Sequence, residues 1–170
     1  FCALCPINTY STAGSGSCSS CLANSESAEG SSECICSGGY SQVGSGRNLV
    51  CNICAAGSSS ISGAATCSAC AVNTYSLGGT GYCLSCPVGS TSIAGSDSCV
   101  CGSDSSFVVA SGSCVCNAGF EQSGSAEFGL TCIPCTSGKY SNFGDNICIS
   151  CPANTFSIEQ AGSCISCPSS

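Results

Sequence analysis

The chain has 170 residues, of which 22 are cysteine, and its two basic residues against nine acidic ones give a net charge of −7. Without clustered Lys and Arg it cannot neutralise phosphate groups, which excludes nucleic acid as a partner and argues against docking on anionic lipid. Only 35 Ile, Leu, Val, Phe and Tyr residues are present and no apolar run approaches the about 20 residues that a membrane span needs, so covalent cross-links must supply what burial does not.

The cysteines form eleven close pairs, and successive pairs begin 15 to 18 residues apart. A fixed period indicates a repeat protein, and this cysteine content indicates a disulfide scaffold from an oxidising, extracellular or cell-surface compartment. We therefore predict a small disulfide-rich repeat: an elongated rod of about ten short two-armed loops, with little regular secondary structure and some short β-hairpins. The ten loops between the pairs are residues 5–18, 21–34, 36–51, 54–67, 70–83, 86–99, 101–114, 116–132, 135–148 and 151–164.

A turn residue stands three positions after the cysteine that opens each loop. All ten are Gly, Asn or Asp, the residues that best tolerate positive φ, so each loop is expected to turn there. They are Asn8, Asn24, Gly39, Gly57, Asn73, Gly89, Asp104, Gly119, Gly138 and Asn154. In eight loops a second glycine follows five or six residues later, which predicts two extended arms joined by a turn.

An aromatic residue follows the turn in six loops, and we expect it to cover the flanking disulfide and the next loop. These residues are Tyr10, Tyr40, Tyr75, Phe120, Tyr140 and Phe156. No segment keeps a helical apolar period, which predicts that helix is absent.

A longer period of about 80 residues lies above the short one, because residues 34–40 match residues 114–120 and the loop 70–83 matches the loop 151–164. Five loops make one larger unit, which predicts superrepeats at 1–82 and 83–170. The chain begins and ends inside a repeat, so we expect both superrepeats to be internal pieces of a longer secreted protein.

The loop pattern Cys-Pro-x-Asn/Gly-Thr-Tyr-Ser, closed by Cys-x-x-Cys, resembles the ephrin-receptor-like cysteine-rich repeat. It is also similar to the first submodule of tumour-necrosis-factor-receptor repeats. The Cys-x-Cys-x-x-Gly-Tyr/Phe pieces at 34–40 and 114–120 resemble the C-terminal half of an EGF-like domain. Such modules occur in receptors, secreted scaffolds, protist surface coats and flagellar hairs.

The receptor resemblance implies a disulfide ladder in which each opening cysteine pairs with the first cysteine of the next close pair, while Cys2 and Cys167 pair outside the chain. The residues alone leave a crossed scheme open, first cysteine to first and second to second. The implied pairs are Cys5 with Cys18, Cys21 with Cys34, Cys36 with Cys51, Cys54 with Cys67, Cys70 with Cys83, Cys86 with Cys99, Cys101 with Cys114, Cys116 with Cys132, Cys135 with Cys148 and Cys151 with Cys164.

Metal binding is the sharpest chemical alternative, because Cys-x-x-Cys repeated about 13 residues later is also the spacing of a four-thiolate zinc ribbon. The odd number of pairs, the three Cys-x-Cys variants and the lack of nearby Lys and Arg disfavour zinc. Because the eleven cysteine pairs are equivalent, no single pair is expected to be a reactive redox site. Calcium needs several converging oxygens, and Asp97, Asp104 and Asp145 are isolated, so no metal or cofactor is expected.

Enzymatic chemistry is not expected, because the chain has no histidine to activate a serine or cysteine nucleophile. Glu26, Glu29 and Glu33 form the only acidic cluster, and a solvated face explains them better than a catalytic carboxylate pair. No Asn-x-Ser/Thr sequon occurs, but the many serines and threonines offer O-glycan acceptors.

The sequence thus favours a structural, non-enzymatic subunit of an extracellular filament, flagellar hair or surface coat, whose partners are copies of itself or neighbouring repeats. Low charge permits close lateral packing, and a regular superrepeat offers the same contacts at a fixed interval. The alternatives are a receptor or adhesion ectodomain stalk that binds a protein ligand, and a protist surface antigen. The absence of Trp and the single Arg disfavour a receptor hot spot.

Overall fold

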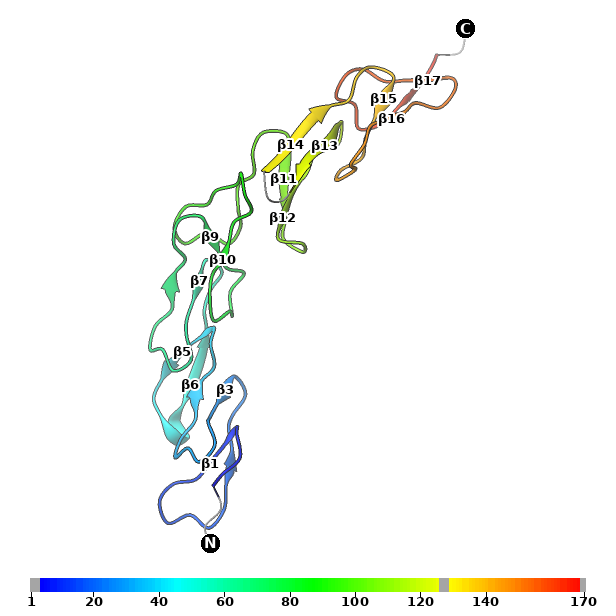
Figure 1. Cartoon of the computed structure of the whole chain (residues 1–170). Coiled ribbons are helices and arrows are strands. Elements are labelled where there is room, and N and C mark those ends of the chain that lie inside the picture. Colours follow the sequence, from blue (N-terminus) through cyan, green and yellow to red (C-terminus); the bar gives the residue numbers. More distant parts are fainter. Residues whose placement is uncertain (1–3, 126–128, 169–170) are drawn as a thin grey trace. The chain divides into compact units, whose positions relative to one another are not determined.

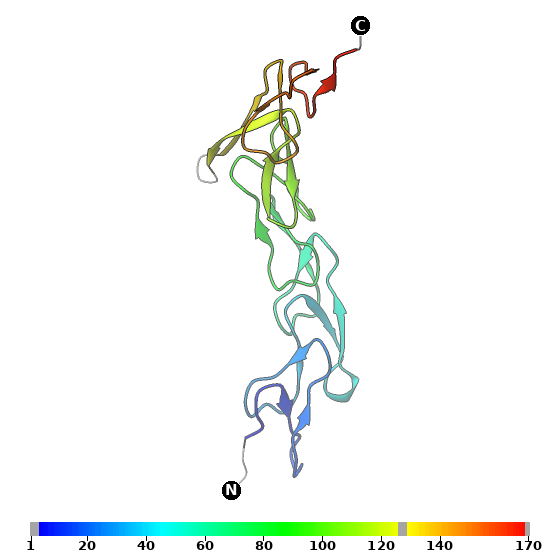
Figure 2. The same cartoon turned by 90° about the vertical axis from the view of Figure 1, so that its right-hand side faces the viewer.

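Short antiparallel hairpins are the building element of this protein, seen in a computed structural model that describes residues 4–125 and 129–168 (Figures 1 and 2). The chain divides into two compact units. Unit 1 consists of the chain up to Ser85 together with Ile93–Ser98, and unit 2 consists of Cys86–Ser92 together with the chain from Cys99 onward. The described residues form nine two-stranded sheets, ten disulfides and no α-helix, which confirms the predicted fold class of a small disulfide-rich repeat.

The sheets of unit 1 follow the order of the loops. Their strand pairs are β1 (Thr9–Tyr10) with β2 (Ser19–Ser20), β3 (Ser25–Glu26) with β4 (Ile35–Cys36), β5 (Tyr40–Val43) with β6 (Val50–Ile53), β7 (Ser58–Ser59) with β8 (Ser68–Ala69), and β9 (Thr74–Tyr75) with β10 (Leu84–Ser85). A single 3₁₀ turn, η1 (Gly46–Asn48), lies between β5 and β6.

Unit 2 repeats the arrangement. A single bridge between Thr91 and Val100 replaces the hairpin in its first loop. The strand pairs that follow are β11 (Ser105–Val108) with β12 (Ser113–Cys116), β13 (Phe120–Ser125) with β14 (Gly129–Pro134), β15 (Lys139–Tyr140) with β16 (Ile149–Ser150), and β17 (Thr155–Phe156) with β18 (Ile165–Ser166).

Each hairpin is built on the turn at its start. In the first loop the N–H of Thr9 donates to the carbonyl of Pro6, which closes a β-turn around the positive-φ residue Asn8. The carbonyl of Asn8 then accepts from the N–H of Cys21, and the next two residues pair with Ser19 and Ser20 between the cysteines of a close pair. Turn and cross-link therefore fix the register of a strand that is too short to fix its own.

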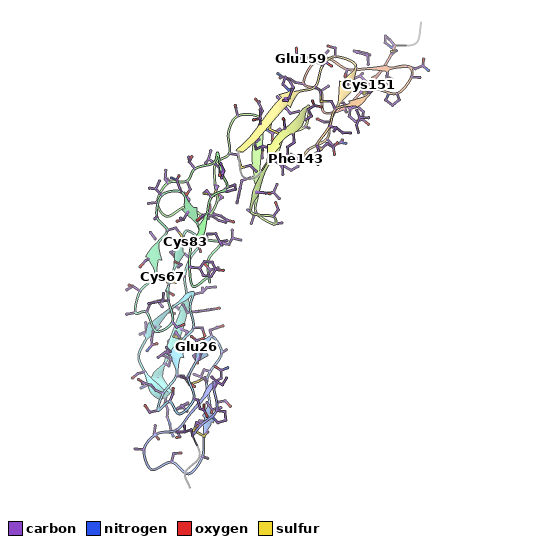
Figure 3. All side chains as sticks on the ribbon, in the orientation of Figure 1. Glu26, Cys67, Cys83, Phe143, Cys151 and Glu159 are labelled. Carbon is purple, nitrogen blue, oxygen red and sulfur yellow. A yellow bond between two sulfur atoms is a disulfide. The ribbon has the colours of Figure 1, made fainter. Side chains whose placement is uncertain are left out.

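The core of the described structure is made chiefly of disulfide sulfur. Apart from eight cysteines, the only buried hydrophobic residues among those described are Leu49, Tyr75 and Phe120. Figure 3 shows side chains, among them the labelled cysteines Cys67, Cys83 and Cys151, distributed along thin ribbon loops. The aromatic residues differ in burial, since Phe156 is 43 % exposed although the sequence led us to expect a covering role.

Two equivalent glycines test how closely a loop approaches the second loop after it. Gly57 and Gly89 both have φ near 80°, but a Cβ on Gly57 would collide with the carbonyl oxygen of Gly95, whereas a Cβ on Gly89 meets nothing within 4 Å. Gly57→Ala should therefore cost about 1–3 kcal/mol more than Gly89→Ala, which suffers only the backbone penalty of about 1–2 kcal/mol. Denaturant unfolding of both variants without reductant measures the difference, and equal losses would contradict this close approach.

Candidate functional site: the interface between successive loops

Ten disulfides close the ten loops, and each joins an opening cysteine to the first cysteine of the next close pair, as the receptor resemblance implies. The ring closes 13 residues along the chain in eight loops, and 15 or 16 residues along it in the loops opened by Cys36 and Cys116. The bonds are Cys5–Cys18, Cys21–Cys34, Cys36–Cys51, Cys54–Cys67, Cys70–Cys83, Cys86–Cys99, Cys101–Cys114, Cys116–Cys132, Cys135–Cys148 and Cys151–Cys164.

Cysteines that share a disulfide have no thiolate to offer a metal, which removes the ligand set of the zinc alternative. Among the described residues only Cys167 is free, and it is exposed; Cys2 lies outside them. No group of three or more His, Cys, Asp or Glu residues placed to hold a metal ion is found in the described part of the chain. Nor does any helix there have the length and apolarity to cross a membrane.

The ten turn residues all have positive φ. The asparagines and Asp104 lie at 63° to 64°, and the five glycines lie between 80° and 92°. They are Asn8, Asn24, Gly39, Gly57, Asn73, Gly89, Asp104, Gly119, Gly138 and Asn154. After each turn the chain runs back along its own loop. The carbonyl of the opening cysteine takes no part in the turn and is available to accept a hydrogen bond from another loop.

That carbonyl accepts a hydrogen bond from the next loop. The donor is the backbone N–H nine residues after the next opening cysteine, at 2.8 to 3.0 Å. The donor and acceptor pairs are Gly30 to Cys5, Gly63 to Cys36, Gly79 to Cys54, Gly95 to Cys70, Gly144 to Cys116 and Gln160 to Cys135. Successive loops are thus joined by the same bond wherever it forms.

A serine six residues after the opening cysteine adds a side-chain bond in the same place. We call these residues the docking serines. Five of them donate from Oγ to a carbonyl of the preceding loop at 2.7 to 2.9 Å, and all five are buried. The pairs are Ser27 to Thr9, Ser60 to Tyr40, Ser76 to Ser58, Ser141 to Phe120 and Ser157 to Lys139.

Spacing within the close pair decides whether this docking occurs. All six loop junctions that carry the carbonyl bond contain Cys-x-x-Cys. Where the pair is Cys-x-Cys, the carbonyls of Cys21, Cys86 and Cys101 receive no such bond within the described ranges. The loops that follow those junctions also lack the serine, having Gln42, Phe107 and Gln122 in its place. A connector that is one residue shorter shifts the next loop, so its N–H no longer meets the carbonyl of the opening cysteine.

Gln42 shows what replaces the docking serine. Its Oε1 accepts from the N–H of Cys36 at 3.0 Å, so the amide bonds to its own loop instead of the preceding one. Beside it, Leu49 is buried with Cys34 and Cys36, and Tyr10 packs against this cluster from the first loop. The Cys-x-Cys junction in unit 1 is therefore held by apolar packing rather than by the repeated hydrogen bonds.

Large apolar residues stand directly after four docking serines and point outward. Strand-like alternation places the serine inside and its neighbour outside. The exposed fractions are 74 % for Ile61, 52 % for Leu77, 79 % for Ile93 and 69 % for Ile158. Ile61, Leu77 and Ile93, here called the apolar series, belong to three consecutive loops of unit 1. The same apolar group is thus presented once per loop.

The acidic residues serve the structure locally. Glu26, labelled in Figure 3, accepts from the Ser62 hydroxyl, and Glu121 accepts from the N–H of Cys148 at 3.0 Å. Asp145 accepts two bonds from Asn142 at 2.8 and 2.9 Å. A shallow hollow there is lined by Glu26 and Glu33 together with Ser27, Ala28, Gly30, Ser31, Ser32 and Ile35.

Comparison with protein families and curated proteins supplies no relative from which a role could be transferred. No family model matches the chain, and no curated protein matches it significantly. The candidate site therefore rests on the chain's own geometry. The docking serines are the candidate-site positions that the sequence did not predict, although serine occupies that position in seven of the ten loops.

The docking serines can be tested at Ser141, which is fully buried, donates to Phe120 and accepts from the N–H of Gly119. Ser141→Ala leaves that carbonyl without its side-chain donor and should lower the free energy of unfolding by about 1–3 kcal/mol. Ser150→Ala, at an exposed site between Cys148 and Cys151, should change it by less than about 0.5 kcal/mol. Chemical denaturation under non-oxidising, non-reducing conditions measures both, and an unchanged Ser141→Ala would refute the docking role.

Proposed function

We propose that the chain is a structural, non-enzymatic subunit of an extracellular filament, flagellar hair or surface coat, and that copies of the chain contact one another. The observation that carries this proposal is the apolar series. Three large side chains, Ile61, Leu77 and Ile93, are each more than half exposed at the same position of consecutive loops. A surface that repeats along the chain fits best a partner with the same repeat, namely another copy.

Energetics support association through these positions. Removing apolar surface from water contributes about 25 cal/mol per Å², and a row of Ile and Leu side chains offers that gain at each loop. The chain carries only eleven charged residues, so lateral contact between copies entails little desolvation of charge. Its net charge of −7 is spread over 170 residues and is screened beyond about 8 Å at physiological ionic strength.

Chemical composition supports a role without catalysis. The chain has no histidine, and Glu26, Glu121 and Asp145 accept hydrogen bonds from their own neighbours. The ten disulfides fit an oxidising environment such as the outside of a cell. Resemblance to ephrin-receptor-like, tumour-necrosis-factor-receptor-like and EGF-like modules points in the same direction, and the exposed serines remain candidate O-glycan sites.

Electron microscopy of native, unreduced protein tests the proposal. We expect regular filaments or sheets that fall apart on reduction, because opening the loops destroys the repeated surface. The triple variant Ile61→Asp, Leu77→Asp, Ile93→Asp should prevent assembly, since it places charge where apolar contact is needed. The matched control Ala65→Asp, Ala71→Asp, Ala94→Asp adds the same charge at exposed sites of the same loops and should still assemble.

Monodisperse single particles under all these conditions would overturn the proposal and favour a receptor or adhesion stalk or a surface antigen. Assembly that both triple variants lose equally would show that added charge, not the apolar series, controls contact. Circular dichroism of each variant verifies that its hairpins are retained, so that loss of assembly is not loss of fold.

A further inference from the structure

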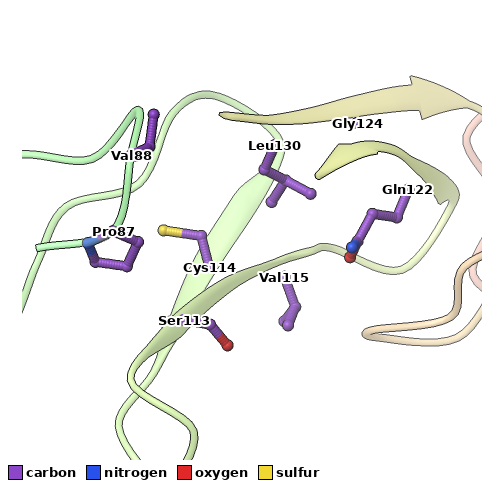
Figure 4. Close-up of a pocket in the computed structure, with 8 residues that line it drawn as sticks. All are labelled: Pro87, Val88, Ser113, Cys114, Val115, Gln122, Gly124 and Leu130. Carbon is purple, nitrogen blue, oxygen red and sulfur yellow. The ribbon is translucent and has the colours of Figure 1, made fainter. Parts of the chain in front are cut away.

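Unit 2 contains an open cavity of about 180 Å³ between its first loop and the hairpins that follow (Figure 4). Pro87 and Val88 lie on one side, and Leu130 and Gln122 lie on the other. Val115, Cys114 and Gly124 complete the lining, and its polar side chains are the amide of Gln122 and the hydroxyl of Ser113, which is hydrogen-bonded to the Ser111 hydroxyl at 2.7 Å. Val88 is 57 % exposed, so the cavity is accessible from solvent.

The duplicated sequence of unit 1 shows what such a cavity can hold. Cys34 and Leu49 correspond to Cys114 and Leu130, because each pair occupies the same positions around a Cys-x-Cys junction. In unit 1 the ring of Tyr10 packs against Cys34 and Leu49, and Leu49 is only 7 % exposed.

Among the described residues of unit 2, no aromatic ring lines the corresponding place. The loop that begins Cys5-Pro6 has Tyr10 five residues after its cysteine, whereas the loop that begins Cys86-Pro87 has Thr91 there. Leu130 accordingly lines an open space instead of lying in a buried cluster. The position that the Tyr10 ring fills in unit 1 thus corresponds to the open cavity in unit 2.

The glutamine beside the junction also differs between the two units in its hydrogen bonds. The amide of Gln42 bonds to the N–H of Cys36 and, through Nε2, to the carbonyl of Gly44. Gln122 holds the same position in its loop, but its amide forms no hydrogen bond within the described residues and extends along the cavity toward Val115. It can donate to or accept from a hydroxyl group placed in the cavity.

We propose that this cavity binds one aromatic ring that carries a hydroxyl group, that is, a phenol. An apolar cavity of about 150 Å³ is large enough to hold benzene, so the volume suits a single ring. Pro87, Val88, Val115 and Leu130 contact the ring, and the amide of Gln122 bonds to the hydroxyl. This inference does not depend on the proposed assembly, because it concerns the cavity of one chain.

Two sources could supply the phenol: a free small molecule, or a tyrosine of another copy. The chain itself offers one such tyrosine, because Tyr82 is 69 % exposed, while its other four tyrosines are buried or half-buried. Insertion of Tyr82 into the cavity of the next copy would be a head-to-tail contact.

Titration with p-cresol, the analogue of the tyrosine side chain, tests the cavity directly. In methyl NMR spectra of the dilute chain, the signals of Val88, Val115 and Leu130 should shift and saturate with a Kd on the order of 1 mM, as expected for so small a ligand. Toluene should bind about three- to tenfold more weakly, and Gln122→Leu should abolish that preference by removing the hydrogen-bonding group.

A matched pair of variants locates the binding. Val88→Trp fills the mouth of the cavity at an exposed position and should weaken p-cresol binding at least about tenfold. Ile7→Trp places the same ring at the corresponding exposed position of the first loop and should leave binding unchanged. No saturable shift, or equal affinity in both variants, would overturn the proposal.

Phe128 lies outside the described residues but is close in sequence to Leu130, so the titration is repeated with Phe128→Ala. Similar affinity in that variant supports a vacant cavity, whereas binding only in that variant would mean that the chain fills the cavity itself and would overturn the proposal. Sedimentation at increasing protein concentration separates the two sources. If a neighbouring copy supplies the ring, Tyr82→Ser and added p-cresol each reduce association; if association is insensitive to both, the source is a free phenol.

Discussion

Closure of short loops by disulfides is the constraint on which this structure depends. Strands that are mostly two residues long, together with the three buried non-cysteine hydrophobic residues of the described ranges, cannot fix a fold in a chain so rich in serine and glycine. Each disulfide closes a ring of about 14 residues, which in the chain-entropy model stabilises the folded state by about 3 kcal/mol. The cross-links restrict the unfolded chain so strongly that weak hairpin and loop-to-loop bonds suffice to order the rest.

The length of the connector between two disulfide-closed loops decides how those loops contact each other, and a difference of one residue is enough. A Cys-x-x-Cys connector lets the carbonyl of the opening cysteine meet an N–H of the next loop and lets a buried serine dock beside it, as Ser60 and Ser76 do. A Cys-x-Cys connector removes both contacts, and apolar packing or a cavity appears there instead. The Cys-x-x-Cys junctions thus repeat the same contacts along the chain, while the apolar cluster and the cavity lie at Cys-x-Cys junctions.

Local features of the fold could be predicted from sequence because they depend on single residues. Asn8 and Gly57 mark positive-φ turns through their own conformational preferences, and the cysteine period marks the rings. The docking of Ser141 on Phe120 was not predicted, because serine has no hydrophobic signature and its partner is a backbone carbonyl of another loop. The cavity was not predicted either, since a missing ring at Thr91 becomes visible only when Tyr10 is seen packed against Leu49. The five-loop superrepeats at 1–82 and 83–170 remain a prediction from the sequence pattern.

The most direct measurement of the central claim is a disulfide map of the unreduced native chain by peptic digestion and mass spectrometry with fragmentation between the cysteines of each close pair. We expect each opening cysteine to be linked to the first cysteine of the next pair, beginning with Cys5–Cys18 and Cys21–Cys34. Peptides that join first cysteine to first and second to second, such as Cys5 to Cys21, would contradict it. The loops, their register and the docking of the serines would then have to be built on a different frame.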